Sequence, residues 1–259
     1  MSRTILVERD GGIATVILNR PNKLNALVKD MWRLLGETML SLSADNTIRC
    51  IVLRGAGEKA FSPGNDISEF ESQRHDVKSA RAYGQLMRRS IDAMAECRHP
   101  IVAMIHGICV GGGLELAALC DIRICGQSSR FGAPINKLGL VMTYDEMSAL
   151  LKLVGRARTM EILLEGRIYP AEDAREMGLV QRVVADSEVT EQAYDSALHI
   201  ASGAPLVARW HKKFATRLEN PKAISAEERK EGFDCFNTSD FKEGYQAFLA
   251  KRKPFFRGL

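Results

Sequence analysis

The chain lacks any run of about 20 apolar residues, the length that a helix needs to cross a bilayer. Its opening residues soon include an acid, Glu8, and look like a strand, so they do not resemble a secretory signal. No strict internal period appears either, which gives no support from sequence for a solenoid. We therefore expect a cytoplasmic protein with no membrane contact.

Metal and redox motifs are also missing. The six cysteines form no Cys-x-x-Cys pair, and four lie inside or beside apolar stretches, which is typical of buried thiols in a reducing compartment. The five histidines show no metal-ligand spacing. The chain has neither the spaced glycines of a dinucleotide fingerprint nor a Gly-Lys-Ser/Thr phosphate loop. We expect no structural metal and no bound cofactor.

A strong net charge is absent as well. The chain has 36 Lys and Arg residues against 32 Asp and Glu residues, and the two signs are interspersed. Nucleic acid is therefore not an expected partner. The main basic cluster, Lys251-Arg252-Lys253, is short and by itself favours a solvated helix end over a phosphate-binding site.

Strands alternate with helices through the first half of the chain. Residues 4–7 and 13–18 are rich in apolar and β-branched side chains, and the Asp10-Gly11-Gly12 turn between them predicts a β-hairpin. Apolar residues at helical spacing predict a helix over 24–43. These signals favour a mixed α/β fold, with further helices at 79–97 and 114–119 and strands at 48–53, 101–105 and 121–125.

The second half is mostly helical. We expect helices at 145–154, 157–164 and 171–177, with Gly178 suited to end the last one. A strand at 179–184 precedes four more helices, at 187–202, 204–218, 223–236 and 239–251. We divide the chain into a core, residues 1–202, and a C-terminal helical region, residues 203–259. With few strands to pack on, that region must pack on its own core or on another subunit.

Three consecutive glycines, Gly111-Gly112-Gly113, lie between an apolar strand and a helix. Glycine costs up to ~1 kcal/mol in a regular element, but it lets a backbone N–H approach a ligand, and N–H groups at a helix N-terminus suit a developing oxyanion. Glu115 follows among apolar neighbours, where a carboxylate tends toward a raised pKa and exchanges protons near neutrality. A tight turn with a surface or capping glutamate explains these residues equally well.

A second turn-rich segment runs from Lys59 to Ile67. Its Gly64 and Asn65 are suited to expose backbone N–H groups, and Asp66 is suited to cap a helix that begins near Ile67. By itself the segment is explained as well by an ordinary loop and helix cap.

Five phrases, in order along nearly the whole chain, resemble the signature of the crotonase (enoyl-CoA hydratase/isomerase) superfamily. They are Asn19-Arg20-Pro21-Asn22-Lys23-Leu24-Asn25-Ala26-Leu27; Ala60-Phe61-Ser62-Pro63-Gly64-Asn65-Asp66-Ile67; His106-Gly107 with Gly111-Gly112-Gly113-Leu114-Glu115-Leu116-Ala117 and Cys120-Asp121; Gly166-Arg167 with Gly178-Leu179-Val180; and Phe248-Leu249-Ala250-Lys251-Arg252-Lys253-Pro254-Phe255.

The resemblance implies a crotonase-like spiral of ββα units and a C-terminal helical region that builds homotrimers or homohexamers. It also implies an acyl-CoA substrate, with coenzyme A entering as part of that substrate rather than as a cofactor, and a setting in fatty acid β-oxidation or related acyl-CoA breakdown.

The resemblance also implies roles for individual residues. The thioester oxygen would lie between the backbone N–H groups of Asn65 and Gly112, where one such donor to an enolate is worth ~3 kcal/mol. Glu115 would be the catalytic acid/base. The basic tail at Lys253 would meet the phosphates of coenzyme A, from a neighbouring subunit. The full set of implied substrate-binding residues is Leu24, Ala60, Ser62, Gly64, Asp66, Ile67, Gly111 and Lys253.

The chain departs from the family pattern at the second of two glutamates that hydratases of this family use around one water. That glutamate follows the proline of a Phe-x-x-Pro-Glu phrase, and here the residue after Pro134 is Ile135, which cannot transfer a proton. Either Glu115 does both jobs or a nearby group substitutes. For Glu146 we favour a structural role, since Thr143 and Glu146 match a capping box. The candidate substitutes are Tyr144, Asp145 and Glu146.

Three hypotheses remain open from the sequence. The first, which we favour, is an enoyl-CoA hydratase-like lyase with Glu115 as the acid/base. The second keeps the site but decarboxylates or hydrolyses an acyl-CoA, which fits the missing second glutamate and the polar Asn65. The third is a non-catalytic scaffold that binds acyl-CoA, or RNA through basic helices.

Overall fold

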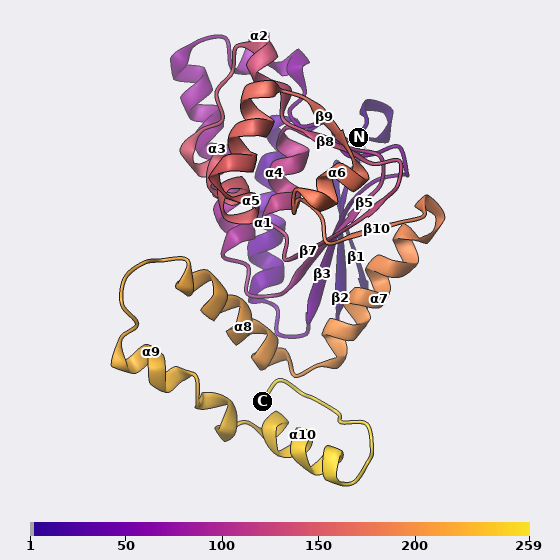
Figure 1. The fold of residues 1–259 in the computed structure, drawn as a ribbon, viewed down its shortest axis with the longest axis vertical. Coiled ribbons are helices and arrows are strands. Elements are labelled where there is room, and N and C mark those ends of the chain that lie inside the picture. The colour runs from indigo at the N-terminus through magenta and orange to yellow at the C-terminus, as the bar shows by residue number, and fades with distance from the viewer. Residues whose placement is uncertain (1–2) are drawn as a thin grey trace.

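The computed structural model describes residues 3–259, whose strands form two sheets (Figure 1). The larger sheet has six strands in the order β1-β2-β3-β5-β7-β10. Only the β1–β2 pair is antiparallel; every other pair in this sheet is parallel. The strands are β1 (Ile5–Asp10), β2 (Ile13–Leu18), β3 (Cys50–Gly55), β5 (Ile101–Ile105), β7 (Ile122–Gly126) and β10 (Arg182–Val184).

The predicted hairpin is confirmed in β1 and β2. Gly11 in its turn has φ +53°, a backbone conformation in which glycine avoids the clash of a Cβ. All six residues of β2 are buried because both faces of the sheet are covered: Val16 and Leu18 pack in the main core, and Ile13 packs in a second apolar cluster that includes Ala193.

The smaller sheet contains four short strands, β4 (Ala60–Ser62), β6 (Ile108–Val110), β8 (Arg130–Gly132) and β9 (Ile168–Pro170), in that order. β4, β6 and β8 run parallel to one another, and β9 is antiparallel to β8. Because parallel neighbours end at the same edge of a sheet, the segments that follow β4 and β6 emerge side by side. These segments contain the two turns singled out in the sequence.

The element order repeats two strands and then a helix: β3-β4, β5-β6 and β7-β8 each place one strand in each sheet. This is the predicted spiral of ββα units. Two long helices, α1 (Lys29–Ala44) and α3 (Val77–Ala95), lie side by side and bury Trp32, Leu35 and Met87 in the main core. The other core helices are α2 (Phe70–Gln73), α4 (Gly112–Ala118), α5 (Tyr144–Glu165), α6 (Ala171–Glu176) and α7 (Val189–Ser202).

Two predicted helices have one end about five residues from the observed one, and two others, expected at 145–154 and 157–164, form the single helix α5. The helix expected to start at residue 24 starts at Lys29, because Leu24 and Asn25 have positive φ angles (52° and 63°) that no α-helix contains. The helix expected over 223–236 is shorter: a capping box at Ser225 starts α9 (Ala226–Glu231), and Gly232 ends it. Short 3-10 helices occupy Pro21–Lys23, Ile67–Glu69, Pro134–Leu138, Asp186–Glu188 and Asp234–Asn237.

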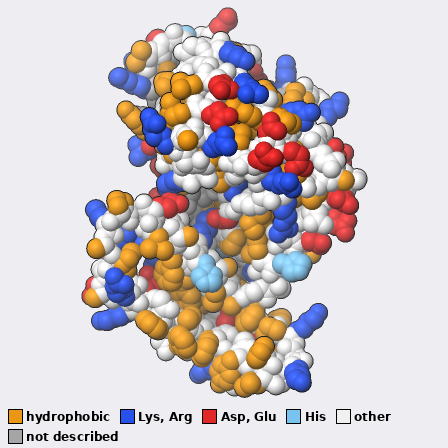
Figure 2. All heavy atoms as spheres, viewed as in Figure 1, with side chains coloured by type: hydrophobic (Ala, Val, Ile, Leu, Met, Phe, Trp, Pro, Cys, Tyr) orange, Lys and Arg blue, Asp and Glu red, His pale blue; other side chains and the backbone are white. Residues whose placement is uncertain are grey.

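The C-terminal helices α8 (Pro205–Leu218), α9 and α10 (Ser239–Leu249) extend away from the two sheets as an arm (Figure 1). The arm is tied back to the core where Arg49 donates to the carbonyl oxygens of Ala201 (3.0 Å) and Phe256 (2.6 Å). Hydrophobic side chains gather on its surface (Figure 2). Among residues 3–259, no helix is both long enough and apolar enough to cross a membrane.

Candidate active site

The loop after β4 and the glycine turn after β6 touch each other. A Cβ placed on Gly64 would lie 2.7 Å from the backbone nitrogen of Gly112, and one on Gly113 would lie 2.1 Å from the carbonyl oxygen of Ser62. Both distances are too short for a side chain. The glycines at these positions therefore allow two backbone segments to meet where α4 begins.

Two backbone N–H groups at this meeting point have no protein acceptor. Leu27 bonds to both neighbours of Asn65: its N–H donates to Gly64 O and its carbonyl oxygen accepts from Asp66 N, each at 2.8 Å. This pairing skips the N–H of Asn65. Gly112 is the first residue of α4, so its N–H has no intrahelical acceptor. Within residues 3–259, neither N–H donates a hydrogen bond.

The side chain of Asn65 is held away from this role. Trp32 donates its indole N–H to Asn65 Oδ1 at 2.7 Å, and Asn65 Nδ2 lies 3.9 Å from the sulfur of Met87. These contacts with α1 and α3 hold the loop that contains Asn65 in place. They leave the backbone N–H of Asn65 as the group that faces a ligand.

Glu115 lies in the first turns of α4 and is 7% exposed. Its Oε2 has no hydrogen-bond partner among the described residues. Burial raises the pKa of Glu115 to about 8, with a further increase from the negative charge of Glu146 and an opposing effect from Arg74. A carboxyl group with this pKa exchanges protons near neutral pH, as a general acid or base must.

These groups line one cavity of about 290 Å³. Asn65, Gly112 and Glu115 form one part of its wall. Ile135 also lines it, so the position of the missing second glutamate faces this space. The remaining lining residues are Ala26, Pro63, Asp66, Ile67, Phe70, Arg74, Val110, Gly111, Pro134, Leu138, Leu140, Val141, Met142 and Glu146.

Only some of the predicted substrate-binding residues line the cavity. Asp66, Ile67 and Gly111 line the cavity, and Leu24 is partly exposed on the loop before α1. Gly64 does not line the cavity; it lies where the loop after β4 contacts Gly112. The side chains of Ala60 and Ser62 are buried and do not line the cavity: Ser62 Oγ donates to Asn25 O and accepts from Gly64 N, so it supports the loop.

Lys253 is exposed on the segment that follows α10 on the arm, and it is not among the residues that line the cavity. A single chain therefore does not bring Lys253 to the site. Its predicted contact with a phosphate requires the arm of another subunit, and it stays a prediction.

The structure separates the three candidates for a second acid. The side chain of Tyr144 is 95% exposed and lies outside the cavity. Asp145 faces Arg88 at 3.7 Å and lines a different hollow. Glu146 lines the cavity with Glu115, but its Oε2 also accepts from Thr143 N at 2.6 Å, which completes the predicted capping box.

Sequence reasoning missed several residues of this site. Trp32 positions Asn65, and Arg20 bonds to Asp66 Oδ2 (2.9 Å) and to Ala26 O (2.7 Å). Phe70 and Arg74 enter the cavity from the segment between β4 and α3. Of these residues, only Arg20 could have been found from the sequence, since it belongs to the first family-like phrase. Trp32, Phe70 and Arg74 lie outside every motif.

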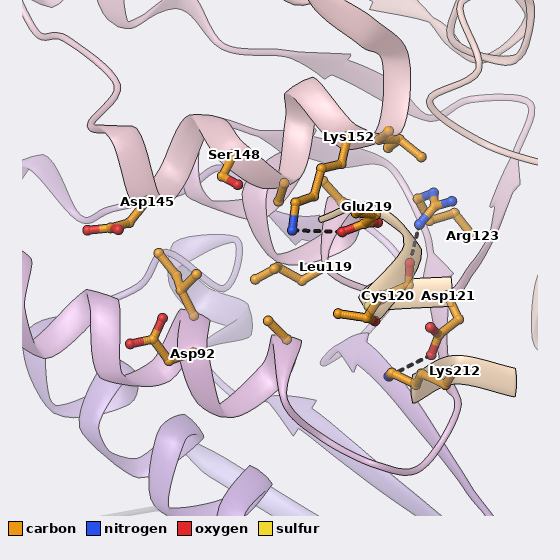
Figure 3. Close-up of a pocket in the computed structure, with 16 residues that line it drawn as sticks. Asp92, Leu119, Cys120, Asp121, Arg123, Asp145, Ser148, Lys152, Lys212 and Glu219 are labelled. Carbon is orange, nitrogen blue, oxygen red and sulfur yellow. Dashed lines mark hydrogen bonds and ion pairs between the residues drawn. The ribbon is translucent and has the colours of Figure 1, made fainter. Parts of the chain in front are cut away.

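A second hollow, of about 350 Å³, lies between α3, α5 and α8 (Figure 3). Its acids are already paired: Glu219 with Lys152 at 2.8 Å, Asp121 with Lys212 at 2.8 Å, and both Asp92 and Asp145 with Arg88 at 3.5 and 3.7 Å. It contains no unpartnered acid like Glu115. The hollow joins the arm to the core and shows no chemistry of its own.

Comparison with known proteins agrees with this geometry. A family model described as enoyl-CoA hydratase/isomerase matches residues 8–258. A short-chain-enoyl-CoA hydratase of Clostridium acetobutylicum is 32% identical over 252 residues, which cover 96% of this chain and 95% of that protein. A crotonyl-CoA hydratase of Syntrophomonas wolfei is 32% identical over 256 residues, covering 97% of each chain.

Solved structures agree as well. An enoyl-CoA hydratase/carnithine racemase from Magnetospirillum magneticum superposes with a TM-score of 0.98 at 47% identity, covering 100% of this chain and 97% of that one. An enoyl-CoA hydratase from Bacillus anthracis gives a TM-score of 0.93 at 29% identity, covering 99% and 100%. The predicted crotonase-like α/β fold is therefore confirmed.

Proposed function

The chain is an enzyme of the enoyl-CoA hydratase/isomerase family, and from this premise we propose that it adds water across the double bond of an enoyl-CoA thioester. One observation carries the proposal: a buried, unpartnered carboxyl oxygen of Glu115 shares a cavity with the two unpaired N–H groups of Asn65 and Gly112. An acid/base group beside two oxyanion donors is what enolate chemistry needs.

In the proposed complex, the thioester oxygen accepts hydrogen bonds from the N–H groups of Asn65 and Gly112. These donors strengthen as the oxygen gains negative charge in the enolate, so they stabilise the transition state more than the substrate. The helix N-terminus at Gly112 adds its partial positive charge. The apolar side chains of Ile135, Val141 and Met142 cover the acyl group.

Glu115 acts as both base and acid in this proposal. Its carboxylate takes a proton from water while the water oxygen bonds to Cβ and the electron pair of the double bond moves onto the thioester oxygen. Glu115 then delivers that proton to Cα, which restores the carbonyl and returns the carboxylate. The net change is the addition of one H and one OH, and no proton transfer at Ile135 is needed.

The direct test is hydration of crotonyl-CoA, followed by the loss of the enoyl absorbance. We expect wild-type turnover and a loss of at least about 1000-fold in kcat for Glu115→Gln, which keeps the shape but removes the proton-transfer group. We also expect kcat/KM to increase with pH up to about 8, because the cycle begins from ionised Glu115. Full activity in Glu115→Gln would refute the proposal.

Decarboxylation is a second candidate reaction, and Ile135 favours it because an enolate formed by loss of carbon dioxide needs no second acid to activate water. Thioester hydrolysis is the third. The same enzyme, supplied with methylmalonyl-CoA and a saturated acyl-CoA, would then release carbon dioxide or free thiol. Either product in place of hydration would identify the reaction.

We further propose that the arm assembles the chain into a homotrimer or homohexamer, and that Lys253 of one subunit approaches the coenzyme A phosphates bound by another. The exposed aromatic residues on the arm support this. The five buried, free cysteines support a reducing, cytoplasmic location.

A further inference from the structure

Among the described residues that line the cavity, Arg74 is the only one with a positively charged side chain. Of its lining residues in the described chain, Asp66, Arg74, Glu115 and Glu146 are ionisable. Arg20 neutralises Asp66 at 2.9 Å. Glu115 holds its proton at neutral pH because burial raises its pKa to about 8. Glu146 directs one oxygen to the N-terminus of α5. Arg74 is left as the positive group of the cavity.

The guanidinium of Arg74 is oriented by aromatic rings rather than by a carboxylate. Its Cζ lies 4.7 Å from the centre of the Phe70 ring and 5.1 Å from that of Tyr83. Tyr83 is 1% exposed, and its hydroxyl donates to Glu69 Oε2 at 3.2 Å. None of the ion pairs within residues 3–259 involves Arg74. Cation–π contacts therefore hold the group in place while its hydrogen-bond donors stay available.

We propose that Arg74 binds a carboxylate carried by the acyl group, so that the substrates of this enzyme are acyl-CoA thioesters with an acidic acyl chain. The inference rests on the proposed function in one respect: it takes the thioester to lie at Asn65 and Gly112, in the same cavity. A guanidinium presents paired N–H donors that match the two oxygens of a carboxylate.

The replacement at Ile135 supports the same conclusion. A second glutamate there would place another negative charge on the wall of this cavity and would repel an anionic acyl group. Ile135 removes that charge, while Arg74 adds a positive one on another part of the wall. A neutral acyl chain would leave the guanidinium of Arg74 without an anionic partner.

The test compares two saturated ligands of equal chain length, glutaryl-CoA and pentanoyl-CoA, by isothermal titration calorimetry. The wild-type enzyme should bind glutaryl-CoA more tightly. Arg74→Gln should weaken glutaryl-CoA binding by about ten-fold or more and change pentanoyl-CoA binding by less than about two-fold. Arg74→Lys should recover part of the loss. Arg81→Gln, at an exposed position on α3 outside the cavity, is the matched control and should change neither.

Two results would overturn the inference. The first is a wild-type enzyme that binds the two ligands equally. The second is an equal loss of both ligands in Arg74→Gln with an unchanged unfolding temperature, because Arg74 would then contact the phosphates of coenzyme A. Neither result depends on hydration, since the ligands have no double bond. A glutaryl-CoA preference without hydration of either crotonyl-CoA or glutaconyl-CoA, the enoyl thioester with a carboxylated acyl chain, would instead reject the proposed reaction and keep the Arg74 subsite.

Discussion

At the scale of single residues, Gly64 controls access to the oxyanion site. A Cβ at this position would lie 2.7 Å from Gly112 N, directly against the N–H proposed to bind the thioester oxygen. We predict that Gly64→Ala lowers kcat/KM for crotonyl-CoA by about 100-fold or more, the cost of losing one oxyanion donor. Steady-state kinetics measures this directly.

Backbone strain has to be separated from this effect, and Gly57 provides the control. Gly64 and Gly57 have φ angles of +94° and +71°, so alanine strains both, at a cost of about 1 kcal/mol in stability. A Cβ on Gly57 meets no atom within 4 Å. Gly57→Ala should therefore lose stability from backbone strain alone and keep its activity, whereas Gly64→Ala adds the clash to the same strain. An equal loss of activity in both variants would contradict the steric argument.

The second prediction concerns the pH dependence of folding stability. The pKa of Glu115 is about 8 in the folded chain against 4.5 in an exposed site. Between these values the unfolded chain has lost the proton and the folded chain keeps it, so wild-type stability falls as pH rises, by about 1.4 kcal/mol per pH unit. Glu115→Gln has no proton to lose. Its advantage in stability over wild type should therefore grow from pH 4.5 to about 8 and then level off.

Urea unfolding at a series of pH values measures this difference. Glu71→Gln, on the exposed surface of α2, is the control for the loss of a carboxyl group outside the cavity. A constant difference between Glu115→Gln and wild type would mean that Glu115 ionises normally in the folded protein. In that event Glu115 would not have the raised pKa on which its proposed acid/base role depends.

At the scale of elements, Lys212 anchors α8 to the core. Its Nζ donates to Asp121 Oδ2 at 2.8 Å and to His99 O at 3.1 Å, and its side chain is 12% exposed (Figure 3). We predict that Lys212→Met destabilises the fold by about 1–3 kcal/mol, because the carbonyl oxygen of the buried residue His99 loses its side-chain donor. Lys213→Met removes an exposed ion pair with Glu231 and should cost less than about 1 kcal/mol. Equal effects in urea unfolding would show that α8 is not anchored by this contact.

Helices and strands could be predicted from the sequence where local patterns, such as turn residues and apolar runs, determine them. The hairpin followed from Asp10-Gly11-Gly12, and the strand at residues 101–105 was predicted with the bounds that β5 has. The two helices expected at 145–154 and 157–164 form one element, α5, with a break at Gly155 (φ 71°). The start of α1 was missed because the left-handed conformations of Leu24 and Asn25 depend on tertiary contacts: Asn25 Nδ2 donates to Ala56 O and Ala60 O.

From the sequence, only the site residues that lie in family-like motifs could be predicted. Asn65, Gly112 and Glu115 lie in phrases that resemble a known family, and the structure brings all three to one cavity. Arg74 and Phe70 lie in a segment without periodicity or motif, and what makes them part of the site is the path of the chain between β4 and α3. Trp32 looks like an ordinary core residue in sequence, and only the fold places its indole N–H against Asn65.

At the scale of the whole molecule, the arm exposes more apolar surface than an isolated chain should. Phe233, Phe248 and Phe255 are 69%, 83% and 71% exposed, and hydrophobic side chains gather on the arm in Figure 2. Apolar patches of this kind mark interaction surfaces. They fit the proposed homotrimer or homohexamer, in which each arm covers a neighbour.

The last prediction tests this assembly. Phe248→Asp places a charge on the arm, where burial at a subunit contact would cost several kcal/mol. We expect light scattering coupled to gel filtration to give a trimer or hexamer for wild type and a smaller species for Phe248→Asp. Val77→Asp, at an equally apolar site that is 67% exposed on α3, should keep the wild-type mass. Because Phe248 lies far along the chain from Glu115, residual turnover in the dissociated variant would show whether one subunit suffices. A monomeric wild-type enzyme would leave Lys253 with no route to a substrate and would end its proposed role.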